Sequence, residues 1–115
     1  MVHIRPASDA DWPSLWPIIS AVLAAGDTYM LPKDTSESEA RSYWMGDGVM
    51  TFVAEREGEV MGTYAMRANQ RGRGAHVANA GYMVSPDCAG QGIGAAMGEH
   101  SLREALRETG HRREF

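Results

Sequence analysis

The sequence is poor in cysteine and lacks any long apolar run. Cys88 is the only cysteine among 115 residues, so an internal disulfide cannot form. A single thiol fits a reducing compartment such as the cytoplasm. No segment approaches the roughly 20 apolar residues that cross a bilayer, and residues 1–6 contain no apolar stretch of signal-peptide length. We therefore expect a cytoplasmic protein with no membrane partner.

The sequence also lacks a surplus of positive charge. Its formal net charge is −4, whereas a general nucleic-acid binder would need a basic face, so we expect no nucleic-acid partner. A local basic patch for one anionic ligand is still compatible with this charge. Neither C-x-x-C nor H-x-x-x-H spacing is present, and the sequence predicts no metal site. With 115 residues and no internal repeat, we expect a single domain over 1–115.

The first part of the chain has the pattern of a strand followed by two helices. Apolar and polar residues alternate over 2–5, which predicts a short strand. Apolar residues at helical spacing over 12–23 predict an amphipathic helix that ends at Gly26. Ser36 and Glu39 have the spacing of a capping box, which predicts the start of a second helix.

The second part predicts three strands and a third helix. Strands are expected over 49–55 and 60–67, joined by a hairpin turn at 56–59, and again over 75–84. A last helix is expected over 95–110. Because the middle strands are linked by a hairpin and no βαβ series is repeated, the fold class is α+β, or mixed α/β.

The segment from Val84 to Ala95 is the most informative part of the sequence. A predicted strand leads into a turn with Gly90, Gly92 and Gly94 at alternate positions, and then into a helix. Glycines permit positive φ and a close approach of the backbone to a ligand. The first helical turn adds unpaired amides and the positive end of the helix dipole. These features predict an anion site suited to a pyrophosphate, although a plain flexible turn before a helix would have the same pattern.

Two other phosphate-binding motifs do not fit this segment. A P-loop would need Lys and then Ser or Thr directly after its last glycine, and Gly94 is followed by Ala95 and Ala96. A dinucleotide-binding fingerprint would follow the first strand and have an acidic residue about 20 positions later. Here the glycines follow the fourth predicted strand, so a nucleotide-binding domain of either kind is disfavoured.

The segment resembles the coenzyme A motif of the GNAT superfamily of N-acetyltransferases. Members of that family commonly have V-x-P-x-x-R/Q-G-x-G-x-G/A at this point, and the predicted order of elements is similar over essentially the whole chain. Ala89 stands where the family commonly has Arg or Gln, so we expect weakened rather than abolished binding. The matching residues are Val84, Pro86, Gly90, Gly92 and Gly94.

The resemblance implies a predominantly antiparallel sheet with helices on both faces. It implies that the protein binds acetyl-CoA as co-substrate and transfers the acetyl group to a primary amine of an unidentified acceptor. It also implies that backbone groups of Tyr82, Met83 and Val84 pair with the pantetheine arm. The amides implied to hold the pyrophosphate belong to Gly90, Gln91, Gly92, Ile93, Gly94 and Ala95.

The resemblance further implies that the C-terminal strands of the family are missing. Family domains usually continue beyond the third helix with another strand, a helix and two more strands, and that helix often supplies a Tyr that protonates the leaving thiolate. We therefore assign no catalytic residue and expect little or no acetyl transfer by this chain alone. The alternative is a truncated CoA-binding or dimerising module without turnover. An open edge on the strand predicted at 75–84 would favour a homodimer.

Several charged or polar residues have plainer interpretations. Arg67, Arg71 and Arg73 could attract the phosphates of a ligand, but we favour a solvated loop. His76 and Asn79 lie on a strand where the family sometimes places a water-ordering base, and packing or edge exposure is the favoured interpretation.

The remaining candidates are also assigned mainly to packing. His100 is interpreted as a surface or helix-packing residue, and Cys88 lacks the relay of a nucleophile. Residues 27–29 are candidates for the acceptor side, because that region borders the acceptor site in the resembled family. Core packing is expected of four aromatic residues at helical spacing, Trp12, Trp16, Tyr43 and Trp44.

Overall fold

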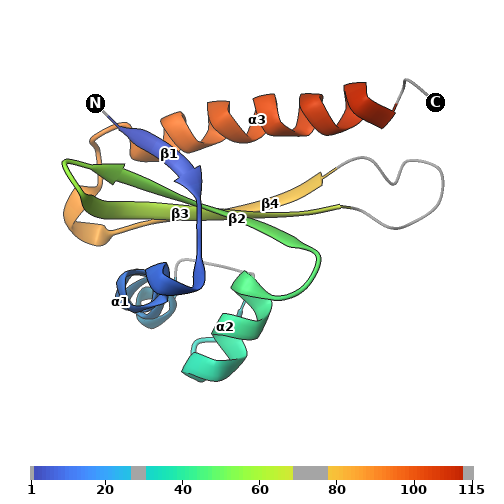
Figure 1. The fold of residues 1–115 in the computed structure, drawn as a ribbon. Helices are drawn as coiled ribbons and strands as arrows, with labels where there is room; N and C mark the ends of the chain where they lie inside the picture. Colours follow the sequence, from blue (N-terminus) through green and yellow to red (C-terminus); the bar gives the residue numbers. More distant parts are fainter. Residues whose placement is uncertain (1, 27–30, 69–77, 113–115) are drawn as a thin grey trace.

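The fold contains the strands and helices in the order that the sequence predicts. The computed structural model describes residues 2–26, 31–68 and 78–112. Figure 1 shows the chain path through these elements. In chain order they are β1 (His3–Pro6), η1 (Asp9–Asp11), α1 (Trp12–Ala25), α2 (Glu37–Met45), β2 (Val49–Arg56), β3 (Glu59–Ala68), β4 (Ala78–Val84), η3 (Pro86–Cys88) and α3 (Ile93–Arg112).

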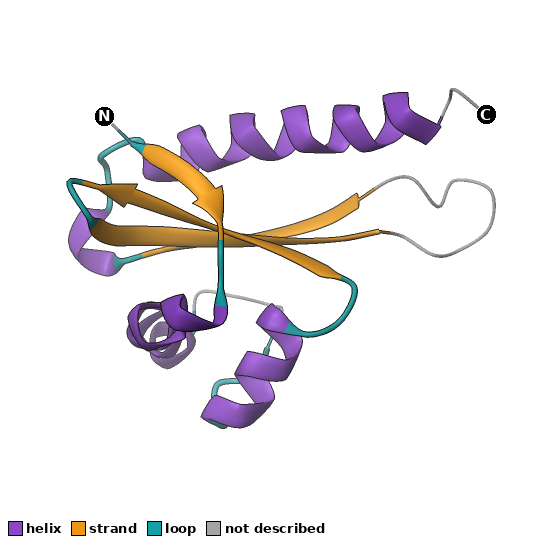
Figure 2. Cartoon of the chain, in the orientation of Figure 1, coloured by secondary structure: helices purple, strands orange, loops and turns teal. Residues whose placement is uncertain are grey.

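The four described strands form one antiparallel sheet in the order β1-β2-β3-β4. Figure 2 shows α1 and α2 against one face of this sheet and α3 against the other. This confirms the predicted α+β class with a predominantly antiparallel sheet and helices on both faces. Among the described strands, β4 lies at one edge of the sheet.

Local capping signals in the sequence set two of the helix ends. α1 ends at Gly26, whose φ of 73° lies in the left-handed region that favours glycine. α2 begins with the predicted capping box: the Glu39 amide donates to the Ser36 hydroxyl at 3.2 Å, and the Ser36 amide donates to the Glu39 carboxylate at 2.9 Å. α3 continues to Arg112 and so passes the end predicted near Gly110.

A two-residue turn joins β2 to β3. Glu57 and Gly58 both have positive φ, 54° and 82°, which is the conformation of a type I′ hairpin turn. Arg56 pairs with Glu59 across the turn. The predicted hairpin is therefore confirmed, with each strand one residue longer than predicted at this end. The turn brings the end of β2 to the same end of the molecule as η3 (Figure 1).

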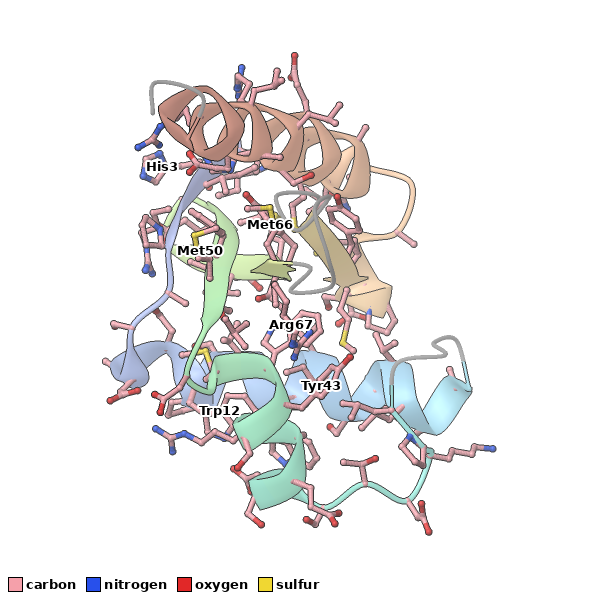
Figure 3. The ribbon with its side chains drawn as sticks, turned by 90° about the vertical axis from the view of Figure 1, so that its right-hand side faces the viewer. His3, Trp12, Tyr43, Met50, Met66 and Arg67 are labelled. Carbon is pink, nitrogen blue, oxygen red and sulfur yellow. The ribbon has the colours of Figure 1, made fainter. Side chains whose placement is uncertain are left out.

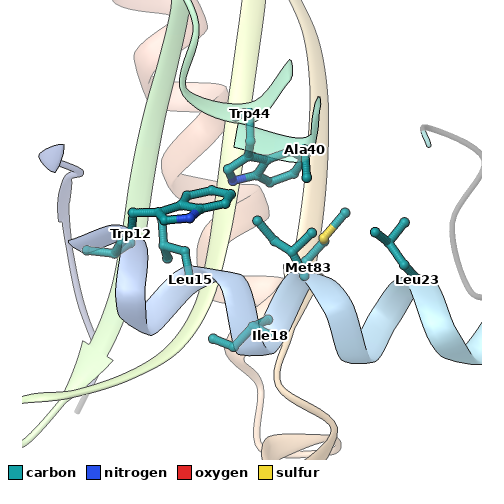
Figure 4. Close-up of a cluster of buried hydrophobic side chains, with 10 residues drawn as sticks. Trp12, Leu15, Ile18, Leu23, Ala40, Trp44 and Met83 are labelled. Atoms are coloured by element: carbon teal, nitrogen blue, oxygen red, sulfur yellow. The ribbon is translucent and has the colours of Figure 1, made fainter. Parts of the chain in front are cut away.

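The sheet separates two apolar cores. On the α1–α2 side, Trp12 and Trp44 are buried, which confirms the packing interpretation of these aromatic residues. Figure 4 shows this cluster around α1. The second core lies between the sheet and α3, and comprises Phe52, Ala54, Met61, Tyr64, Met66, Cys88, Ile93 and Met97. Within the described residues, none of the helices has the length and apolar content needed to cross a membrane.

Candidate functional site

The glycine turn before α3 has the backbone conformation that only glycine adopts readily. Gly90 and Gly92 have φ of 80° and 79°. A Cβ atom added at either residue would meet nothing within 4 Å. Glycine is therefore needed here for its backbone conformation and not for lack of room. The space beside both residues is open to a ligand.

The N-terminus of α3 follows this turn directly. The Ala96 amide donates to the Gly92 carbonyl at 3.0 Å. The amides of Ile93, Gly94 and Ala95 precede this bond, and amides at such positions have no acceptor within a helix. These amides lie at the positive end of the helix dipole, and the two effects together favour the binding of an anion.

The amide of Gln91 is placed differently from those that follow it. It donates to the Cys88 carbonyl at 3.3 Å, within the turn itself. Among the amides that the family resemblance implies to hold a pyrophosphate, that of Gln91 is therefore already hydrogen-bonded within the turn. The amides of Ile93, Gly94 and Ala95 therefore remain the candidate donors to an anion.

A close contact between α3 and the sheet fixes the position of the turn. Ile93 is 1% exposed and Met97 is fully buried. A Cβ at Gly62 in β3 would lie 3.0 Å from the Met83 carbonyl oxygen and 3.1 Å from Ile93 Cγ2 and Met97 Cε. The absence of a side chain at Gly62 thus lets the first turn of α3 pack directly on β3. The sequence analysis missed this residue, although a glycine inside a predicted strand is a signal of close approach.

Tyr82, Met83 and Val84 form the end of β4 that leads toward the turn. Met83 is buried in the core on the α1 side. Tyr82 faces α3, where its hydroxyl lies 2.6 Å from Ser101 Oγ. β4 pairs with β3 on one side, and the structure describes no strand on its other side. Such an edge presents unpaired backbone groups to a ligand or to another strand.

Arg56 connects the β2–β3 hairpin to the glycine turn. Its Nη1 donates to Gln91 Oε1 at 2.9 Å. The sequence analysis missed this contact, and no sequence signal joins two residues that are 35 positions apart. The bond fixes a guanidinium group beside the open turn.

Tyr64 and His100 form a polar pair in the core beneath α3. The Tyr64 hydroxyl lies 2.7 Å from His100 Nδ1, and the His100 ring meets Phe52 edge-on at 5.1 Å between centroids. Burial raises the pKa of Tyr64, and desolvation lowers the pKa of His100. Both shifts favour the uncharged forms, so the pair joins a phenol to a neutral imidazole. This confirms the interpretation of His100 as a helix-packing residue.

Of the predicted arginine cluster, the structure describes Arg67. Arg67 lies in β3, with its guanidinium carbon 3.8 Å from the centre of the Tyr43 ring. Its Nη2 also donates to the Tyr43 carbonyl. Figure 3 shows the two side chains together on the α2 side of the sheet. The solvated-loop interpretation is therefore wrong for Arg67, because the side chain is held by α2.

Of the other predicted candidates, Cys88 and Asn79 lie within the described residues. Cys88 is buried in the α3-side core at 8% exposure. Asn79 pairs with Arg67 in the β3–β4 register. Within the described residues, no group of three His, Cys, Asp or Glu could hold a metal ion. The candidates outside the described residues are 27–29, Arg71, Arg73 and His76.

A cavity lies beside the segment that precedes the turn. It has a volume of about 240 Å³ and is bounded by α1 on one side and by the start of η3 on the other. The cavity could accept a small group next to the end of β4. Its lining residues are Pro17, Ile18, Ala21, Ser85, Pro86 and Asp87.

The fold and the glycine turn place the chain in the class of GNAT-like α+β proteins. Residues 16–115 match the model of the Acetyltransferase (GNAT) family. The chain therefore belongs to that family.

Solved structures of family members have the same fold. A GCN5-related N-acetyltransferase from Kribbella flavida superposes with a TM-score of 0.83 at 38% identity, over 93% of this chain and 66% of that one. A ribosomal-protein-alanine N-acetyltransferase from Brucella melitensis gives 0.75 at 28%, over 91% and 67%. A phosphinothricin acetyltransferase from Sinorhizobium meliloti, in complex with acetyl-CoA, gives 0.73 at 27%, over 90% and 59%. The chain thus spans about two thirds or less of these proteins. Comparison with curated proteins finds no match.

Proposed function

We propose that this protein binds acetyl-CoA and transfers the acetyl group to a primary amine. The observation that carries the proposal is the open turn at Gly90 and Gly92, which leads directly into the N-terminus of α3. Membership of the GNAT family supports the same reading. The acceptor is a small molecule or a protein that presents a primary amine.

In this proposal the turn binds one part of the coenzyme and the end of β4 binds another. The pyrophosphate lies against the backbone from Gly90 to Ala95, where the amides of Ile93, Gly94 and Ala95 donate to it. Backbone groups of Tyr82, Met83 and Val84 pair with the pantetheine arm along the open edge of β4, as an added strand would. In this arrangement the coenzyme runs from the turn along the edge of β4, and the thioester lies at the β4 end of that path.

The chemistry requires positioning more than it requires a covalent intermediate. The amine nitrogen attacks the thioester carbonyl, the C–N bond forms, and the C–S bond breaks as the amine gives up a proton and the thiolate gains one. Holding both reactants in line supplies much of the rate. Backbone amides that meet the developing oxyanion supply more. We assign no side chain to either proton transfer.

The test of binding compares two variants in which Asp replaces a glycine with the same positive φ. Gly92→Asp introduces a side chain and a negative charge into the phosphate site, so we expect it to abolish calorimetric binding of acetyl-CoA. Gly48→Asp is the control, because Gly48 has the same φ of 79° and equally open surroundings but precedes β2. We expect wild type to bind in the micromolar range or more weakly. Unchanged binding by Gly92→Asp would contradict the assignment of the site.

Turnover is tested separately from binding. Release of CoA thiol is measured with acetyl-CoA and a panel of small amines and polyamines, for wild type and for Gly92→Asp. Thiol release that depends on an amine and is lost in Gly92→Asp supports acetyl transfer at this site. Binding without any amine-dependent release would favour a CoA-binding module without turnover.

We also propose that the protein is cytoplasmic and forms a homodimer. A single, free and buried cysteine is compatible with a reducing compartment. The edge of β4 ahead of Tyr82 and the exposed side chains of Leu102 and Leu106 on α3 are surfaces that a second copy would cover.

A further inference from the structure

The β2–β3 hairpin contributes a side chain to the glycine turn. Arg56 is the last residue of β2, and its Nη1 bonds to the side chain of Gln91 at 2.9 Å. Gln91 stands between Gly90 and Gly92, the two residues with left-handed backbone. The neighbouring Ala89 has no polar side chain with which to brace the turn. The bond from Arg56 therefore adds a side-chain restraint to the turn.

The charge of Arg56 is not neutralised by a contact. Other arginines of the chain have carboxylate partners, such as Arg5 with Asp11 and Arg107 with Glu104. In the part of the chain that the structure describes, Arg56 forms no ion pair, and Gln91 is a neutral acceptor. A half-buried cation without a counter-ion favours the binding of an anion beside it.

Arg56 also has hydrogen-bond donors that are free to bind a ligand. Its Nε is buried and has no hydrogen-bond partner among the described residues. One N–H of Nη1 is used by Gln91. Apart from the buried Nε–H, the donors that remain are one N–H of Nη1 and the two of Nη2. Guanidinium groups recognise phosphate through such paired donors and keep their charge at any physiological pH.

We propose that Arg56 binds the pyrophosphate of the coenzyme together with the amides at the start of α3. In this role Arg56 keeps its bond to Gln91 and presents its free Nη donors to a phosphate oxygen. The inference rests on the proposed function and names a further binding residue of that same site. It also explains why a side chain from a distant hairpin is directed at the turn.

The experiment measures the affinity for acetyl-CoA by calorimetry in three variants. Arg56→Ala is expected to weaken binding about 10- to 100-fold, as loss of a hydrogen bond to a charged group does. Arg56→Lys keeps the charge but loses the paired donors, so a smaller loss is expected. Arg103→Ala is the control, because Arg103 is an exposed arginine farther along α3, and no change is expected. The ratio between wild type and Arg56→Ala should shrink as salt is added, because the lost term is electrostatic.

Dephospho-CoA identifies the phosphate that Arg56 contacts. This ligand has the pyrophosphate but lacks the 3′-phosphate, so the loss in Arg56→Ala should persist with it. A loss seen with acetyl-CoA and absent with dephospho-CoA would overturn the assignment to the pyrophosphate. A loss that does not change with salt would show that Arg56 only supports the fold of the turn, and would also overturn the proposal.

The outcomes separate this inference from the proposed function. If wild type does not bind acetyl-CoA, both are wrong. If wild type binds and Arg56→Ala binds equally well, only the role of Arg56 is wrong. Circular dichroism tests whether each variant is folded. If Arg56→Ala is unfolded, the affinity of Arg56→Lys and its dependence on salt test the role of Arg56 instead.

Discussion

His100 is a histidine that the fold keeps neutral. Its imidazole packs edge-on against the rings of Phe52 and Tyr64, and its Nδ1 lies 2.7 Å from the Tyr64 hydroxyl. Desolvation lowers the pKa of His100, while Glu104 opposes the shift and Arg103 adds to it. Protonation would place a charge in this desolvated position, which the surroundings of the imidazole disfavour. The stability of the contact between α3 and the sheet is therefore coupled to pH.

The first prediction concerns this coupling. Because the pKa of His100 is lower in the folded state than its ordinary value of 6.5, the unfolded chain binds the proton first as the pH falls. The contribution to stability is complete above pH 6.5 and is lost progressively below it. In thermal unfolding by circular dichroism, we expect wild type to lose Tm between neutral and mildly acidic pH. His100→Gln should have a Tm lower by about 4 °C at neutral pH and a smaller dependence on pH.

A second histidine provides the control for this measurement. His3 is exposed on β1, so His3→Gln should retain the pH dependence of wild type. Parallel pH profiles for wild type and His100→Gln would show that His100 does not titrate against folding.

Gly62 shows how a single missing side chain positions an element. Any Cβ there would meet the Met83 carbonyl oxygen at 3.0 Å, and a backbone atom cannot move aside as a side chain can. Ile93 and Met97 on α3 are equally close. The first turn of α3, where we propose the anion site, is thus held at its distance from the sheet by a residue of β3.

The second prediction follows from this contact. We expect Gly62→Ala to lower the free energy of unfolding by about 1–3 kcal/mol, as overpacking of a core does, and to weaken acetyl-CoA binding because α3 shifts. Gly98→Ala is the control within α3, since an added Cβ there meets nothing within 4 Å. That change should raise stability by about 0.5–1 kcal/mol through helix propensity. Urea unfolding and calorimetry measure both effects, and a stable Gly62→Ala with unchanged affinity would contradict the account.

The elements that sequence predicted well are those with local signals. Gly26, Ser36 and Glu39 act on backbone groups within a few positions, so their caps could be inferred without any tertiary contact. Glycines at alternate positions likewise predicted the turn before α3.

The contacts that sequence could not predict join residues far apart in the chain. Arg67 resembled a loop cation in the sequence but is held by Tyr43, 24 positions away. Arg56 reaches Gln91 across 35 positions. Such pairs become neighbours only when strands and helices pack, and no periodicity or spacing encodes them. The candidate site was therefore predicted as a backbone turn, and the contact between Arg56 and this turn became visible only in the structure.

Two features of the whole molecule favour association with a second copy. β4 lies at the edge of the described sheet and offers unpaired backbone groups there. Leu102 and Leu106 are 67% and 68% exposed, and their i, i+4 spacing puts them on one face of α3. Tyr82 on β4 is also 41% exposed. Two copies related by a two-fold axis would cover such surfaces in both chains at once, because the same patch serves as both partners.

The third prediction tests this assembly. In sedimentation or light scattering at high micromolar concentration, we expect a mass of about 25 kDa, twice the 12.5 kDa of one chain. Leu102→Glu with Leu106→Glu places charge in the buried part of the interface, so the variant should be a monomer that remains folded. Arg103→Glu changes an exposed α3 residue between them in sequence, and it should remain a dimer. A wild-type mass of 12.5 kDa at that concentration would exclude the dimer. A dimer that persists in the double variant would instead assign the interface to the edge of β4, where pairing is through the backbone and does not depend on these two side chains.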